Sequence, residues 1–229
     1  TGTDFGVLRS PAAGSSAFVG PMDLPCLDGM GPMGGDLMTT NEHIVHPGDG
    51  VRLPGLQSSI PGRVPRGLVL LLHGWEGSIE SAYMRHTAAR LLSEGFDVFR
   101  LNFRDHGETH HLNVGLFHSC RLAEVVLAAK WVAEKFPAPA FLAAGYSLGG
   151  NFALRLALAA PAAGIPLRHA VAVCPAVDPS AVMRALESGP ALYHWYFMKK
   201  WRSSLRKKRA LFPEHHDFDD AILAEDMRG

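Results

Sequence analysis

The apolar positions along the chain fall into short continuous runs separated by longer amphipathic segments. The runs 67–72, 139–144 and 170–174 are apolar at every position, and 96–101 is another run of strand length. Continuous apolar runs of this length are typical of strands covered on both faces of a parallel sheet. The segments between them carry apolar residues three and four positions apart, which predicts amphipathic helices. The most regular helical pattern consists of Leu122, Val125, Val126, Ala129, Val132, Ala133 and Phe136.

Strands and helices therefore alternate from residue 67 onward, which predicts an α/β fold with a doubly wound, mostly parallel sheet and right-handed crossovers. A β-hairpin is expected before it, with extended runs at 40–45 and 51–53 around the turn Pro47-Gly48-Asp49-Gly50, followed by a loop at 54–65. The chain is expected to divide into three regions: an irregular N-terminal arm (1–38), the α/β core (39–178) and a helical cap or lid (179–229).

Composition and charge narrow the classes of function. The formal net charge is zero over 229 residues, so no overall electrostatic attraction favours nucleic acid. The cysteines Cys26, Cys120 and Cys174 have neither disulfide-framework nor zinc spacing, which predicts a reducing, cytoplasmic location. No run approaches the length of a membrane span, and the N-terminal residues lack a signal-peptide pattern. No glycine-rich phosphate-binding motif is present, so a nucleotide-binding protein is disfavoured and no cofactor is expected.

The strongest chemical signal is Gly145-Tyr146-Ser147-Leu148-Gly149, which joins a predicted strand to a predicted helix. A Gly-x-Ser-x-Gly sequence in that position is typical of a nucleophile elbow, in which a serine hydroxyl is exposed at the tip of a sharp turn. Glycine is needed where a Cβ would collide with the backbone, and Ser147 must adopt strained dihedral angles. The N-terminus of the following helix favours negative charge developing beside the hydroxyl.

Two further segments are expected at the same edge of the sheet. The sequence His73-Gly74-Trp75 follows the strand at 67–72, and a polar loop at 102–116 follows the strand at 96–101. Ligands of such sheets bind at the carboxyl ends of the strands. A serine nucleophile needs two backbone N–H groups as an oxyanion hole, and Trp75 and Leu148 are the candidates. Weaker candidates for the substrate pocket are Tyr146, His106 and His110.

Other polar residues are assigned structural roles. Spacing supplies no third ligand for the histidines of the 102–116 loop, so solvated histidines are favoured there and no metal site is predicted. Asp178 is interpreted as a helix N-cap, with a role as catalytic acid as the less favoured alternative. The later histidines lie in polar or lid-like segments: His194, His215 and His216.

The segment 192–212 has two interpretations. An apolar stripe runs through Phe197, Trp201, Leu205 and Phe212, and seven basic residues with no acid lie between Lys199 and Arg209. Such a helix could lie on a membrane surface through residues 197–212. The favoured interpretation is a lid helix whose charges are solvated or paired.

Three motifs together resemble the α/β-hydrolase superfamily: His73-Gly74-Trp75-Glu76-Gly77-Ser78, Arg104-Asp105-His106-Gly107-Glu108-Thr109 and Gly145-Tyr146-Ser147-Leu148-Gly149-Gly150-Asn151. Within it they are most similar to the YheT-like predicted hydrolases and esterases. The resemblance implies an eight-stranded sheet, a helical cap after the sixth strand, and a Ser–Asp–His triad. It makes Ser147 the nucleophile and gives the oxyanion hole to Trp75 and Leu148. The family's acid and histidine follow the seventh and eighth strands; no residue after Cys174 matches them, so both are expected beyond Gly229.

The sequence therefore predicts a serine hydrolase that acts on a small-molecule carboxylic ester with an acyl or lipid-like chain, through an acyl-enzyme on Ser147. An acyltransferase would use the same acyl-enzyme with an alcohol in place of water. A non-catalytic binding protein would keep the elbow and lack the general base. The oligomeric state is left open by the sequence.

Overall fold

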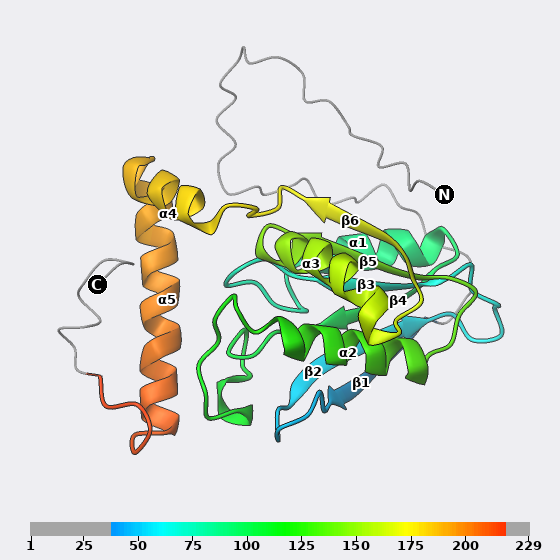
Figure 1. The fold of residues 1–229 in the computed structure, drawn as a ribbon, viewed down its shortest axis with the longest axis horizontal. Coiled ribbons are helices and arrows are strands. Elements are labelled where there is room, and N and C mark those ends of the chain that lie inside the picture. The colour runs from blue at the N-terminus through cyan, green and yellow to red at the C-terminus, as the bar shows by residue number, and fades with distance from the viewer. Residues whose placement is uncertain (1–37, 219–229) are drawn as a thin grey trace, which may run out of the picture. The chain divides into compact units, whose positions relative to one another are not determined.

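The computed structural model describes residues 38–218, so the predicted N-terminal arm lies outside the described residues except for Met38. The described chain contains a six-stranded sheet with the strand order β1-β2-β4-β3-β5-β6 (Figure 1). Strand β2 is antiparallel to both β1 and β4, and the other neighbours are parallel. The strands are β1 (Thr39–Val45), β2 (Leu53–Ser59), β3 (Leu68–Leu72), β4 (Asp97–Leu101), β5 (Phe141–Tyr146) and β6 (Leu167–Val173).

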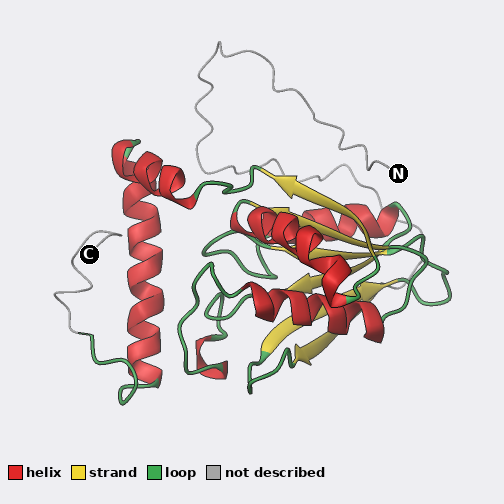
Figure 2. Ribbon diagram, viewed as in Figure 1, coloured by secondary structure: helices red, strands yellow, loops and turns green. Residues whose placement is uncertain are grey.

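Helices cover both faces of this sheet, as the alternation of strands and helices predicts. Helices α2 and α3 pack on one face and α1 packs on the other (Figure 2). Two more helices, α4 and α5, follow β6 and lie beyond the carboxyl ends of the parallel strands. The bounds are α1 (Ala82–Ser93), the 3-10 turn η1 (His110–Leu112), α2 (Leu122–Lys135), α3 (Leu148–Ala163), α4 (Pro179–Ser188) and α5 (Ala191–Leu211).

The central strand β3 is apolar throughout because both of its faces are covered by helices. Its residues Leu68, Leu70 and Leu72 belong to the core under α2 and α3, and Val69 and Leu71 belong to the core under α1. None of the five is more than 4% exposed. Because successive side chains of a strand point to opposite faces, a strand with helices on both sides needs apolar residues at every position.

The predicted hairpin is present, but the predicted loop at 54–65 is wrong in its first part, because β2 continues to Ser59. The pair Pro54-Gly55 is a turn signal that here lies inside a strand. The Pro54 carbonyl accepts a hydrogen bond from the Asn102 N–H at 2.9 Å, and a Cβ at Gly55 would overlap the Phe99 ring. Gly55 is therefore explained by the close approach of an aromatic side chain from β4.

Strand β6 lies at the edge of the described sheet, although its apolar run is typical of a strand covered on both faces. Two of its valines are exposed, Val171 by 55% and Val173 by 41%. The predicted α/β architecture with an N-terminal hairpin is confirmed, and helices follow β6 where a cap was expected. The division of the chain into arm, core and lid stays a prediction.

Candidate active site

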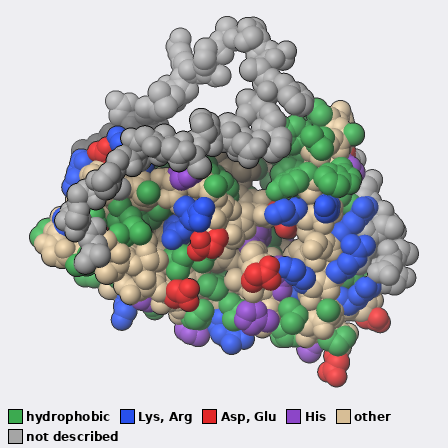
Figure 3. Space-filling view, turned by 180° about the vertical axis from the view of Figure 1, so that it is seen from behind, with side chains coloured by type: hydrophobic (Ala, Val, Ile, Leu, Met, Phe, Trp, Pro, Cys, Tyr) green, Lys and Arg blue, Asp and Glu red, His purple; other side chains and the backbone are tan. Residues whose placement is uncertain are grey.

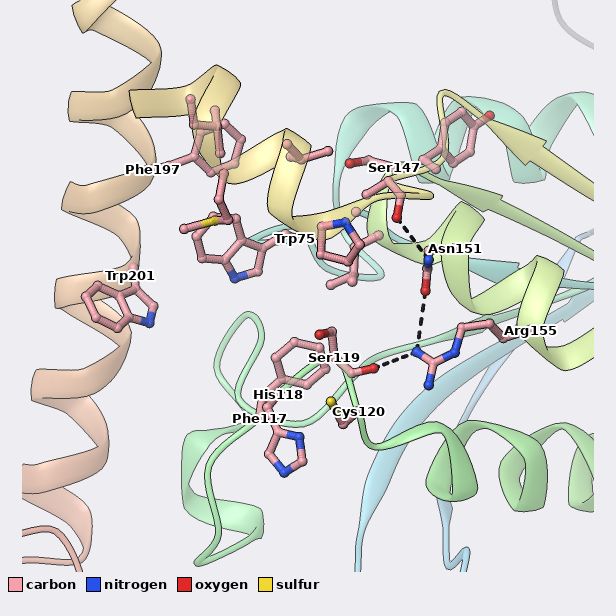
Figure 4. A pocket seen from close by; sticks show the side chains of 18 of the residues that line it. Trp75, Phe117, His118, Ser119, Cys120, Ser147, Asn151, Arg155, Phe197 and Trp201 are labelled. Carbon is pink, nitrogen blue, oxygen red and sulfur yellow. Dashed lines mark hydrogen bonds between the residues drawn. The ribbon is translucent and has the colours of Figure 1, made fainter. Parts of the chain in front are cut away.

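Ser147 lies in the sharp turn that joins β5 to α3 (Figure 4). Its backbone has φ 52° and ψ −112°, which a residue with a side chain avoids unless its surroundings hold it there. The Ser147 N–H donates to the Val173 carbonyl at 2.9 Å. The Ser147 carbonyl accepts from the N–H groups of Asn151 at 3.0 Å and Ala176 at 3.3 Å. The turn thus holds an exposed serine at the N-terminus of a 16-residue helix.

Two glycines make this turn possible. A Cβ at Gly145 would overlap the backbone of Gly149. A Cβ at Gly149 would overlap the carbonyl groups of Leu72 and His73, at the end of β3. The first turn of α3 therefore lies directly against two strands, and the predicted need for glycine at both positions is confirmed.

The loop after β3 borders Ser147. A Cβ built on Gly74 would lie 3.5 Å from the Ser147 Cβ, so the Gly74–Trp75 peptide is next to the serine. Among residues 38–218, neither the Trp75 N–H nor the Leu148 N–H donates a hydrogen bond to protein. Leu148 is the first residue of α3, and an N–H there has no acceptor within its own helix. Two such donors beside a hydroxyl suit an oxygen that gains negative charge, and their role as an oxyanion hole stays a prediction.

The same loop is held by buried groups. His73 is fully buried; its Nδ1 donates to the Gly74 carbonyl at 2.8 Å, and its Nε2 accepts from the Phe103 N–H at 3.0 Å. Burial lowers the pKa of His73 well below its ordinary value, so this ring is neutral and holds the loop in place. Glu76 follows Trp75 in the left-handed region at φ 56°, and burial raises its pKa to about 6.

A cavity of about 910 Å³ lies in front of Ser147 (Figure 4). Three of the predicted site residues line it beside Ser147, namely Trp75, Tyr146 and Leu148. The opposite wall comes from α4 and α5 and is apolar: Pro179, Val182, Met183, Leu186, Phe197 and Trp201. The Phe197 ring stacks on the Trp75 ring with centroids 5.2 Å apart and planes 7° from parallel. Helix α5 therefore covers the loop that borders the serine, as a lid would.

Sequence reasoning missed part of the cavity wall. The loop 117–120 contributes Phe117, His118, Ser119 and Cys120, and α3 contributes Asn151 and Arg155. The loop carries no recognisable motif. The α3 residues had one usable signal, since Ser147, Asn151 and Arg155 are four positions apart and share one face of the helix.

Two histidines predicted for the substrate pocket lie elsewhere, since neither His106 nor His110 is among the residues that line this cavity. His106 is 2% exposed, and its Nδ1 donates to the Arg104 carbonyl at 2.7 Å. Burial lowers the pKa of His106 to about 4. The Nε2 of His110 is 2.7 Å from the Ser204 hydroxyl of α5. The His106 ring packs against His73, Phe103 and Phe117, whereas the His110 ring lies where the loop meets α5. The sequence alone could not show these contacts.

Helix α5 is attached to this loop by a buried ion pair. Lys208 is fully buried, and its ammonium group donates to the Asp105 carboxylate at 2.6 Å. It also donates to the carbonyl groups of His110, at 3.1 Å, and Asn113. The second oxygen of Asp105 accepts from the Phe117 N–H at 2.8 Å. One carboxylate therefore joins α5 to the loop that forms the cavity wall.

Most other cations of α5 point outward. Figure 3 shows Lys and Arg side chains in a column over α5, and the exposed ones are Lys199, Lys200, Arg206 and Lys207. Lys207 is 2.9 Å from Glu108. The charges described here are solvated or paired, as the favoured interpretation expects, and the role of α5 as a lid stays a prediction. Contact of residues 197–212 with a membrane surface stays a prediction. No helix between residues 38 and 218 is both long and apolar enough to cross a bilayer.

The alternative triad residues have other partners. Asp178 is the N-cap of α4, and its carboxylate accepts from the Ala181 N–H at 3.0 Å, so the predicted cap is confirmed. The Nε2 of His216 donates to the Val114 carbonyl at 2.8 Å. In the described part of the chain, no histidine hydrogen-bonds to the Ser147 hydroxyl. The same residues contain no group of three or more His, Cys, Asp or Glu side chains arranged to hold a metal ion.

A helix-covered, mostly parallel sheet with this strand order, and a strained serine between β5 and α3, defines the α/β hydrolase class of fold. The family model described as "alpha/beta hydrolase fold" matches residues 67–212, more than half of the chain. The chain belongs to this family.

Named relatives agree with this assignment. "Putative esterase YheT" of Escherichia coli (strain K12) is 26% identical over 147 residues, which cover 63% of this chain and 43% of that protein. The chain thus spans less than half the length of this curated relative. Among solved structures, an esterase of Pyrobaculum calidifontis is 25% identical with a TM-score of 0.53, covering 66% of this chain and 50% of that one. An esterase of Pyrococcus furiosus is 22% identical with a TM-score of 0.57, and the match covers 73% of this chain and 63% of that one. The predicted resemblance to YheT-like α/β hydrolases is confirmed.

Proposed function

We propose that the protein is a serine hydrolase that cleaves carboxylic esters through an acyl-enzyme on Ser147. The observation that carries the proposal is the strained, exposed serine at the N-terminus of α3, beside two N–H groups without protein acceptors in residues 38–218. This is the geometry of a nucleophile elbow. The names of YheT and of the structural neighbours, which describe esterases, support the same class of reaction.

In this mechanism the Ser147 hydroxyl attacks the ester carbonyl carbon, and the carbonyl oxygen becomes an oxyanion. The N–H groups of Trp75 and Leu148 would bind that oxygen, each lowering the barrier by about 3–4 kcal/mol. Collapse of this intermediate expels the alcohol and leaves an acyl group on Ser147. Water then attacks the acyl-enzyme and releases the acid. The dipole of α3 stabilises the negative charge in both steps.

The attack requires a base that removes the proton from Ser147, and an acid that orients that base. No histidine between residues 38 and 218 contacts the Ser147 hydroxyl. The proposal therefore assigns both groups to a part of the protein outside these residues, in line with the expectation that they lie beyond Gly229.

The cavity favours a small ester with an acyl or lipid-like chain. Its volume of about 910 Å³ is within the usual range for small-molecule sites. Its lid-side wall is apolar, and Trp75, Phe197 and Trp201 supply broad aromatic surfaces for a hydrocarbon chain. Tyr146 is fixed at the same cavity, with its hydroxyl 2.5 Å from the Thr87 hydroxyl. Between residues 38 and 218, Cys120 and Cys174 form no disulfide, which supports the proposed cytoplasmic location.

The test is fluorophosphonate labelling of the full natural protein, read by intact mass and peptide mapping. We expect one adduct, on Ser147, and loss of both labelling and ester hydrolysis in Ser147→Ala. Ser119→Ala is the matched control, because Ser119 lines the same cavity but lies in an ordinary loop. Labelling that persists in Ser147→Ala would refute the proposal. A folded full-length protein that is neither labelled nor active would favour the alternative of a binding protein.

An acyltransferase would share every structural feature described here. A hydrolase and an acyltransferase are distinguished by measuring the products formed when a primary alcohol is present. A transferase forms the new ester in preference to the free acid. We expect the free acid to dominate.

A further inference from the structure

Among the described residues, the lining of the cavity contains a single permanently charged side chain. Of the described side chains that line it, Arg155 alone is always ionised, and its surroundings are mainly aromatic and aliphatic. Arg155 lies on α3, two turns beyond Ser147 on the same face. A cation at this position affects any substrate that fills the cavity, because the substrate must displace the water that solvates it.

The guanidinium group is held in one place. Its Nη1 donates to the Ser119 carbonyl at 2.7 Å and to the Asn151 side-chain oxygen at 3.4 Å (Figure 4). Its carbon atom lies 5.4 Å from the centre of the Phe152 ring. These contacts turn the side chain back toward the N-terminus of α3, the direction that long side chains on a helix prefer. The charge is therefore carried at the level of Asn151, one turn from the serine.

The remaining hydrogen-bonding capacity of Arg155 is not used by the described protein. Arginine has five N–H donors, and two are on Nη1. The other three, on Nε and Nη2, have no partner within residues 38–218. Arg155 also forms no ion pair with any described carboxylate. By contrast, Arg104, near the start of the loop between β4 and α2, pairs with Glu124 at 2.5 Å.

We infer that Arg155 binds an anionic group of the substrate, so that this site selects esters carrying a carboxylate or a phosphate-like group. The inference rests on the proposed reaction at Ser147. A neutral chain would desolvate the guanidinium without compensation, which is costly, whereas an anion can accept two of its N–H groups in parallel. Asn151 is four positions after Ser147, and each position adds about 1.5 Å along a helix, so the anion lies roughly 6 Å from the carbonyl that is attacked.

The test compares matched esters on the full natural protein. The charged substrates are mono-p-nitrophenyl adipate and the p-nitrophenyl ester of 5-phosphonopentanoic acid, which place a carboxylate or a phosphonate at this distance. The neutral reference is methyl p-nitrophenyl adipate, which differs from the first only by esterification of its carboxylate. A second pair, 4-acetoxybutanoate and its methyl ester, places the charge on the alcohol side and is followed by acid release. We expect kcat/KM to favour the charged member of at least one pair by about 10- to 100-fold, the range of a charge-assisted hydrogen bond.

The ratio between charged and neutral esters is the deciding quantity, because a purely structural role of Arg155 would change both rates equally. Arg155→Met should bring the ratio close to one, and Arg155→Lys should restore part of it. Arg90→Met is the matched control: Arg90 is on α1, pairs with Glu94 and does not line the cavity. The carboxylate and phosphonate arms show which anion is preferred.

Three results would overturn the inference: no preference for the charged member of either pair, a preference that survives in Arg155→Met, or the same loss in Arg90→Met. An anion supplied to Arg155 by the protein itself would produce the first of these. Failure of the proposed function looks different, since Ser147 would then be unlabelled and the neutral ester would not be hydrolysed.

Discussion

Replacing Lys208 by methionine tests how α5 is attached to the core. The change keeps an unbranched side chain of similar length and removes only the ammonium group. In the folded protein that group is fully buried and donates to Asp105, His110 and Asn113. All three acceptors belong to the loop between β4 and α2, at least 95 residues away in the sequence. The substitution therefore acts on the contact between α5 and this loop and leaves the sheet untouched.

The expected cost follows from burial. Removing one member of a buried ion pair typically destabilises a protein by about 3–5 kcal/mol, because the other charge is left in a poorly solvating environment. Asp105 would keep its hydrogen bond from the Phe117 N–H but lose its cation. If detachment of α5 exposes the unpaired Asp105 carboxylate to water, the lost stability appears as local opening of α5. A change of about 3 kcal/mol raises the opening equilibrium by roughly 150-fold.

Hydrogen exchange followed by mass spectrometry measures that opening. Peptides from 191–211 and from the loop at 104–117 should exchange roughly 100-fold faster in Lys208→Met. Peptides from β3 and β5 should exchange as in the parent protein. The matched control is Lys207→Met: Lys207 pairs with Glu108, whose side chain is 90% exposed, and such pairs contribute at most about 1 kcal/mol.

A double variant tests the cause. Asp105 has φ 59°, a conformation that asparagine also tolerates, so Asp105→Asn keeps the backbone and an acceptor for the Phe117 N–H. Combined with Lys208→Met it removes both charges and should recover much of the protection of α5. Equal exchange in the parent and in Lys208→Met, or no recovery in the double variant, would show that the ion pair does not hold the lid.

Two other predictions concern stability. Gly149→Ala should destabilise the fold by about 3 kcal/mol or more in urea titrations, because its Cβ would overlap the end of β3. Gly164→Ala, where a Cβ meets no atom within 4 Å and only φ 67° is unfavourable, should cost roughly 1–2 kcal/mol; equal costs would contradict this reasoning. Acid should destabilise the protein through His106, whose pKa is about 4 when folded and 6.5 ordinarily. Between these two pKa values the unfolded chain binds a proton that the folded chain does not. The neutral His106 therefore contributes about 3 kcal/mol to the free energy of unfolding above pH 6.5, and this contribution is lost as the pH falls toward 4. His106→Asn should flatten this dependence without abolishing it, because burial of His73 acts in the same direction; an unchanged slope would contradict the assignment.

The sequence predicted features that depend on local chemistry. The turn at Ser147 was predictable because Gly145 and Gly149 lie so close to neighbouring backbone that no residue with a Cβ fits there. The N-cap at Asp178 was predictable because its acceptor lies within three residues of the N–H it binds. The helix at 122–135 was predictable because one apolar stripe determines both its period and its buried face.

Features that depend on distant contacts were not predictable. Lys208 lies in a basic run that resembles a solvated helix face, and only the partner loop reveals that it is buried. The pair Pro54-Gly55 was interpreted as a loop, because the Phe99 ring that requires the glycine comes from another strand. His106 and His110 were placed near the substrate by their position in a polar loop. His106 is buried against His73, Phe103 and Phe117, and His110 against Ser204 of α5.

In the proposed mechanism, the reaction at Ser147 and the selection of the substrate would depend on different parts of the structure. The backbone of Ser147 is held by hydrogen bonds to Val173, Asn151 and Ala176, all outside α4 and α5. Phe197 lines the cavity near the start of α5, and the buried Lys208 attaches the other end of the same helix to the core. Loosening the lid should then alter which esters are bound while leaving the geometry of the serine intact. Variation among relatives that share the serine turn would accordingly be concentrated in the lid and in the loop that anchors it.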